Sequence, residues 1–188
     1  MAMNQMILVT GALFLLGIII LSANTTFREN ERVVTDSEFG IAAVSLATSL
    51  IEEAEGKAFD QACTDSGINS VALLTPKSMF GPSVTERYRS TDTTLSDFDD
   101  LSDYDGFTIE YVNDSTKAQV AQYRGESKGF RADYFLQTKV EYVSAGNGAA
   151  DLNNATSART WHKKLTVTVT SPSSIDTLNL STIISYWN

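Results

Sequence analysis

The sequence contains little of the chemistry on which most enzyme active sites depend. Its 188 residues include one cysteine, Cys63, and one histidine, His162. A single cysteine excludes an intramolecular disulfide, and one cysteine with one histidine supplies few of the parts that nucleophile–base catalysis requires. We interpret Cys63 as a half-buried thiol, with a redox or ligand role as the alternative, and His162 as a strand residue. We expect the protein not to be an enzyme.

Proline and positive charge are also scarce. The first of the three prolines is Pro76, so no proline interrupts a helix in the first part of the chain. Fourteen basic side chains stand against 23 acidic ones, which gives a net charge of -9. This balance repels nucleic acid phosphates, so we expect no DNA or RNA partner. The chain also lacks a glycine-rich phosphate loop and a serine elbow.

The longest uncharged run lies near the start of the chain, where residues 6–23 read MILVTGALFLLGIIILSA. As a helix this run would be about 27 Å long, just enough to cross the hydrocarbon core of a membrane. A cleaved signal peptide is the alternative, but no basic residue precedes the run and residues 22–24 form a weak cleavage site. We therefore expect a retained helix that is buried in lipid or against copies of itself.

Helical periodicity resumes after a charged joint at residues 28–32. Apolar residues then recur at spacings of three and four, which is typical of a helix with one apolar stripe. Together with the uncharged run, this pattern predicts one helix of about 55 residues that ends near Gln61. The stripe comprises Phe39, Ala43, Leu46, Ala47, Leu50, Ala54 and Ala58.

The last part of the chain alternates apolar and polar residues, a pattern that favours β-strands. The alternation covers residues 107–111, 134–142, 164–170 and 178–186, and the turn residues 171–174 predict a hairpin between the last two. We expect an α+β fold in which the helical stripe covers one face of a three- or four-stranded antiparallel sheet. The expected regions are a long helix at 1–62, an irregular acidic connection at 63–106 and a sheet head at 107–188.

An acidic segment precedes the first expected strand. Carboxylates in such a cluster supply the oxygen ligands that Ca²⁺ prefers, although the spacing does not follow the EF-hand pattern. A solvated or locally hydrogen-bonded loop is the alternative, and we expect no other cofactor. Trp161 and Trp187 could be ligand platforms, but core packing or closure of the sheet edge explains them as well. The five candidate calcium ligands are Asp97, Asp99, Asp100, Asp103 and Asp105.

The whole layout resembles that of type IV pilins and the pseudopilins of type II secretion. The resemblance rests on the uncharged run continuing into an amphipathic helix, on the final strands, and on residues 99–106, DDLSDYDG, which are similar to a segment of some minor pilins. It implies a prokaryotic cell-surface filament whose subunits polymerise through their N-terminal helices. The implied assembly residues are Leu8, Gly11, Leu13, Phe14, Leu16, Gly17, Ile18, Ile20 and Leu21.

The same resemblance implies further partners and leaves two alternatives open. Subunits of this kind stand in the cytoplasmic membrane before an assembly machinery, like that of pili or type II secretion, moves them into the filament. The family's cleavage glycine is followed five residues on by glutamate, whereas Gly11 and Gly17 are followed by Leu16 and Ser22. The alternatives are a non-polymerising, membrane-anchored minor pilin, pseudopilin or envelope binding protein, and an anchored enzyme or carbohydrate-binding module.

Overall fold

The computed structural model describes residues 2–89, 93–112, 123–126, 132–144, 154–174 and 176–187. It divides into two compact units, Met1–Gly40 and Ile41–Asn188. The first unit is helical throughout its described length, and the second contains the end of the same helix together with every strand. The two units are considered separately below.

Helix α1, Ala2–Glu55, confirms the predicted long N-terminal helix. Within the first unit several threonine and serine hydroxyls bond back to the helix itself. The hydroxyl of Thr10 donates to the carbonyl of Met6 at 2.8 Å, and the hydroxyl of Thr35 donates to the carbonyl of Glu31 at 2.9 Å. Such back-bonding leaves no hydroxyl hydrogen unsatisfied in an apolar environment. The helix is long and apolar enough to cross a membrane.

The helix ends at Glu55, six residues before the expected Gln61, and the backbone then turns toward the acidic segment. Gly56, a poor helix former, is the first residue beyond it. The Ala58 N–H donates to the Asp99 carbonyl at 3.0 Å, and the Leu101 N–H donates to the Ala58 carbonyl at 2.9 Å. Ala58 therefore belongs to a bridge between segments rather than to the helical stripe.

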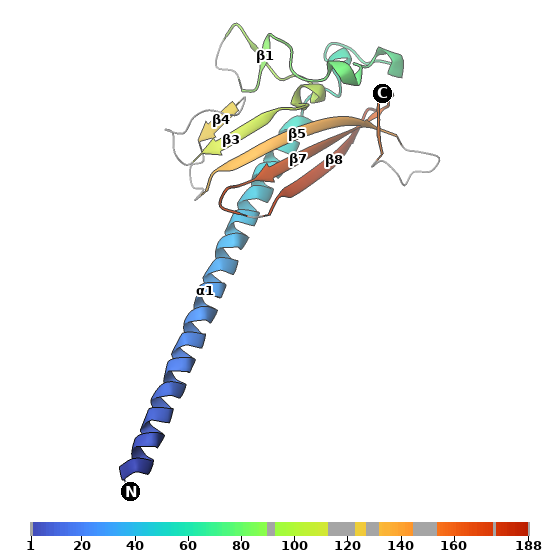
Figure 1. The fold of residues 1–188 in the computed structure, drawn as a ribbon. Helices are drawn as coiled ribbons and strands as arrows, with labels where there is room; N and C mark the ends of the chain where they lie inside the picture. The colour runs from blue at the N-terminus through green and yellow to red at the C-terminus, as the bar shows by residue number, and fades with distance from the viewer. Residues whose placement is uncertain are drawn as a thin grey trace. The chain divides into compact units, whose positions relative to one another are not determined.

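The main sheet has the strand order β4-β3-β5-β7-β8, with the two-residue β6 paired to β5 (Figure 1). Neighbours among β3, β5, β7 and β8 are antiparallel, as the alternating pattern predicted, and β7 and β8 form the predicted hairpin. Strand β4 was not predicted, and it pairs in parallel with β3. The strands are β3 (Thr108–Val112), β4 (Tyr123–Glu126), β5 (Tyr134–Val143), β6 (Ala155–Thr156), β7 (His162–Thr170) and β8 (Leu178–Ser185).

The last turns of α1 lie behind this sheet (Figure 1) and bury one side of the helix. Ala47, Leu50 and Ala54 are at most 3% exposed. The covered sheet face carries the buried members of the strand alternation, and the hydroxyl of Thr182 on that face donates to Glu55 at 2.8 Å. Burial of this apolar face, at about 25 cal/mol per Å², is the main force holding helix to sheet. The buried strand residues include Leu136, Val140, Leu165, Val167 and Val169.

Short elements fill the connection between α1 and β3. Four 3₁₀ helices occur in the described residues; three precede a small parallel pair, β1 with β2, and the fourth lies within the acidic segment. Glu53 of α1 accepts hydrogen bonds from Tyr88 at 3.0 Å and Tyr104 at 3.4 Å, which ties this connection to the helix. The elements are η1 (Gln61–Cys63), η2 (Val71–Leu73), η3 (Lys77–Met79), β1 (Glu86–Arg87), β2 (Ser96–Asp97) and η4 (Leu101–Tyr104).

Candidate functional site

The first candidate site is the apolar surface of α1 within the first unit. Leu8 is 73% exposed and Leu16 is 53% exposed, and the other large apolar residues from Met6 to Leu21 lie in a similar range. A Cβ placed at Gly11 or Gly17 would meet no atom within 4 Å. All nine predicted assembly residues thus lie on exposed helix surface, and this surface goes all round the helix rather than along one stripe.

The second candidate is the acidic segment, which the structure separates into different environments. Asp97 is exposed in β2. Asp100 is the N-cap of η4 and accepts from the Ser102 N–H at 2.5 Å. Asp105 pairs with Lys77 at 2.5 Å and accepts from the Val140 N–H at 2.9 Å. These three aspartates therefore have local structural roles or face solvent, and they do not converge on one point.

Two of the predicted ligands do converge, and Glu86 of β1 joins them. Glu86, Asp99 and Asp103 each offer a carboxylate oxygen within 4.8 Å of the others. Glu86 and Asp103 are buried, whereas Asp99 is exposed. One oxygen of Asp103 accepts from the N–H groups of Asp99 and Asp100 at 3.1 and 3.2 Å, which completes a capping box with Asp100. Such a group of carboxylates could bind a hard cation such as Ca²⁺, which prefers oxygen ligands.

The carboxylates of this group lie close enough for their negative charges to repel one another. Burial, followed by the charges of Asp100 and Glu86, raises the pKa of Asp103 to about 7 from an ordinary 3.8. Burial and the charge of Glu86 also raise the pKa of Asp99. Like charges at close range favour a bound proton or a bound cation. Sequence reasoning missed Glu86 because it lies outside the acidic segment, in a strand of only two residues.

A third polar cluster lies inside the head and was not predicted. Lys163 of β7 is 0% exposed, and its ammonium lies 2.7 Å from Asp60 Oδ2. The same nitrogen donates to the Phe59 carbonyl at 2.8 Å and to the Ser102 hydroxyl at 2.7 Å. Burial lowers the pKa of Lys163 despite the opposing charge of Asp60. The sequence did indicate that Lys163 would be buried, since Lys163 lies two residues before the buried Leu165 and therefore on the same face of the strand.

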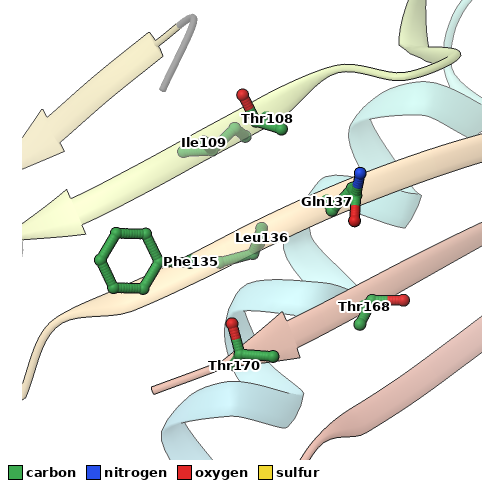
Figure 2. A pocket seen from close by; sticks show the side chains of 7 residues that line it. All are labelled: Thr108, Ile109, Phe135, Leu136, Gln137, Thr168 and Thr170. Carbon is green, nitrogen blue, oxygen red and sulfur yellow. The ribbon is translucent and has the colours of Figure 1, made fainter. Parts of the chain in front are cut away.

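A depression of about 250 Å³ lies on the sheet face that α1 does not cover. In Figure 2 the side chains of Thr108, Gln137 and Thr168 extend from this face beside the ring of Phe135. The residues that line it carry hydroxyl, amide and apolar groups and no ionisable group. This lining offers hydrogen bonds and a ring surface, but none of the acid–base chemistry of an active site.

The remaining candidates from the sequence lie in ordinary environments. Cys63 is half-buried, and burial together with the charge of Asp60 raises its pKa, which disfavours the reactive thiolate. His162 is half-buried and lies 2.7 Å from the Ser185 hydroxyl. Trp161 stacks on Tyr186 with centroids 5.3 Å apart, as expected for closure of the sheet edge. Trp187 is 86% exposed.

No protein-family model, no curated protein and no solved structure matches this chain. The long N-terminal apolar helix and the antiparallel sheet on which its end packs are compatible with a pilin-like layout.

Proposed function

We propose that the chain is a structural subunit of an extracellular, type IV pilus-like filament that polymerises through the first part of α1. The observation that supports this most strongly is the uncharged, exposed helical surface of residues 6–23. Each large side chain there would gain about 1.5–3 kcal/mol on leaving water. Exposed apolar surface of this extent marks an interaction site with a membrane or another protein.

The apolar surface of such a helix can be buried first in a membrane and later in a filament. In the cytoplasmic membrane its backbone bonds are internal and its side chains meet lipid. In a filament the same side chains would pack against the helices of other copies, with Gly11, Ala12 and Gly17 allowing backbones to approach closely. Because both environments are apolar, transfer between them changes the solvation free energy of the helix little. The favourable free energy of assembly would come from the packing of helices against each other. An assembly machinery like that of pili or type II secretion would carry out this transfer.

The head suits display on a surface. Its outer sheet face presents threonine, serine, lysine and glutamate side chains, and the acidic net charge favours solubility. We also keep the alternative of a non-polymerising subunit anchored in the membrane, because the apolar length of the helix alone supports both. The two proposals differ in whether copies of the helix contact each other.

A charge placed in the helix separates them. Leu16→Lys should abolish fibres seen by electron microscopy of sheared surface material, because an unpaired ammonium cannot enter a dry helical core. The matched control is Ser181→Lys, which adds the same charge on exposed β8 and should leave fibres intact. Mass spectrometry of the fibres must identify this chain. Normal fibres with Leu16→Lys, or fibres that lack the chain while the membrane retains it, would overturn the filament proposal.

A further inference from the structure

The buried pair of Lys163 and Asp60 has a geometry that goes beyond an ordinary ion pair. Both side chains are 0% exposed, and the two residues come from distant parts of the chain, Lys163 from the interior strand β7 and Asp60 from just after α1. Three aromatic rings surround the ammonium nitrogen, which lies 4.8 Å from the centroid of Phe59, 4.7 Å from Phe80 and 5.3 Å from Tyr142. The amine and the carboxyl group therefore meet in an apolar cage.

The two oxygens of the Asp60 carboxyl group lie in different environments. Oδ1 accepts three hydrogen bonds, from the Ala62 N–H at 3.2 Å, the Thr75 N–H at 2.9 Å and the Thr75 hydroxyl at 2.8 Å. Oδ2 faces Lys163 at 2.7 Å and the Tyr142 hydroxyl at 3.2 Å. Three fixed donors on one oxygen are what stabilises the oxyanion of a tetrahedral acyl intermediate, while the other oxygen is placed to leave.

A route for the proton of the amine is also present. The Ser102 hydroxyl accepts from Lys163 Nζ at 2.7 Å and is itself hydrogen-bonded to the carboxylate of Asp100. Asp100 is 1% exposed. Burial lowers the pKa of Lys163. The lowered pKa and the short contact with Ser102 favour movement of a proton from the amine through Ser102 toward Asp100.

We propose that Lys163 condenses with Asp60 to form an intramolecular isopeptide bond. One Nζ proton moves to Oδ2, 2.7 Å away, which leaves a neutral amine beside a neutral acid; Nζ then attacks Cγ of Asp60, so the Nζ–Cγ bond forms and negative charge gathers on Oδ1. The Cγ–Oδ2 bond then breaks, and Oδ2 leaves as water. Of the three ammonium protons, one stays on the amide nitrogen and two leave on Oδ2: the first passes directly from Nζ, and the second passes from Nζ to the Ser102–Asp100 pair and returns to Oδ2 through Ser102 and the nitrogen. No oxidant or co-reactant is needed.

The product suits its surroundings better than the reactants do. A buried ion pair carries a desolvation penalty that a neutral amide does not. The amide would also fix the segment that follows α1 to strand β7, inside the sheet, by a covalent link. This inference concerns the head alone and does not depend on the proposed filament.

Intact mass tests it directly. The full chain, purified in detergent, should show a native near-ultraviolet spectrum and, after denaturation, a mass lower than that of its sequence by one water molecule. Proteolysis should yield a branched peptide that joins the segment of Asp60 to that of Lys163. Lys163→Arg keeps the positive charge but should retain the full mass. Asp100→Asn and Ser102→Ala should slow the mass loss after cell-free synthesis while preserving the spectrum.

One side reaction gives the same mass and must be distinguished. The Asp105–Gly106 sequence can lose water by closing into a succinimide, which leaves a linear peptide and reverses in mild base. The isopeptide survives base and gives the branched peptide. A natively folded wild-type chain with its full mass would overturn the proposal, and so would a loss of water found only in linear peptides.

Discussion

The mutual repulsion of Glu86, Asp99 and Asp103 predicts that the head becomes less stable as the pH rises toward neutrality. Asp103 has a pKa of about 7 in the folded protein and an ordinary 3.8 when unfolded, so between these values the folded state binds more protons. Its stabilising contribution is therefore greatest at low pH and is lost as pH rises through 7. Integrated from about pH 5 to about pH 8, the loss is about 2 to 3 kcal/mol.

The other aspartates with shifted pKa values do not cancel this effect in the chosen window. The lowered pKa of Lys163 acts in the opposite direction, because the folded state then binds fewer protons than the unfolded chain. The raised pKa values of Asp99 and Asp100 act in the same direction. In the uncondensed ion pair, burial raises the pKa of Asp60, but the charge and hydrogen bonds of Lys163 and Thr75 outweigh burial and lower that pKa, so this contribution changes only below about pH 4. In the proposed isopeptide Asp60 carries no titrating group. For a head of this size, the loss should lower Tm by roughly 5–10 °C.

The assay is thermal unfolding of the full chain in a non-ionic detergent, followed by near-ultraviolet circular dichroism. Asp103→Asn should flatten the pH dependence, because its amide oxygen can still accept from the N–H groups of Asp99 and Asp100 but carries no charge. The matched control is Asp97→Asn, in exposed β2, which should keep the wild-type slope. A wild-type Tm that is constant or rises between pH 5 and 8 would refute the reasoning, as would an unchanged slope in Asp103→Asn.

Three further predictions follow from the packing and the acidic group. Leu50→Ala should reduce the free energy of unfolding of the head by about 2–5 kcal/mol in denaturant titrations, whereas the exposed neighbour substitution Ser49→Ala should change it little. Gly106 has φ 70, so Gly106→Ala should cost about 1–2 kcal/mol in the same titration; an unchanged midpoint would contradict this. If Glu86, Asp99 and Asp103 hold calcium, millimolar Ca²⁺ should raise Tm at pH 8 and not at pH 5, and Asp99→Asn should remove the shift. The absence of any shift would remove the calcium hypothesis.

Local periodicity was enough to predict the helix and four of the strands, because each of these elements buries one regular face. The stripe that includes Ala47, Leu50 and Ala54 is the buried side of α1. Strand β4 was missed because Tyr123–Glu126 is short and contains a glycine, so its pairing depends on β3 rather than on its own pattern. The end of the helix was placed too late because the backbone partners of Ala58 come from residues 99–101, far along the chain.

The candidate sites likewise depend partly on local sequence patterns and partly on contacts between residues that are far apart in the chain. The acidic segment was visible in the sequence, but the grouping of Glu86 with Asp99 and Asp103 depends on how β1 folds against η4. The pair of Asp60 and Lys163 is separated by 103 residues, and no spacing rule connects residues so far apart. Parity within β7 placed Lys163 on the buried face, yet only the tertiary fold supplies the carboxylate that makes its burial possible.

The position of β7 has a consequence for biosynthesis. This strand lies between β5 and β8 and carries Lys163, so the sheet cannot close until β7 and β8 have left the ribosome. Contacts of such long range are slow to form. Helix α1 emerges before these strands, and it would be free to enter a bilayer while the head is still an open, unfolded polypeptide on the ribosome.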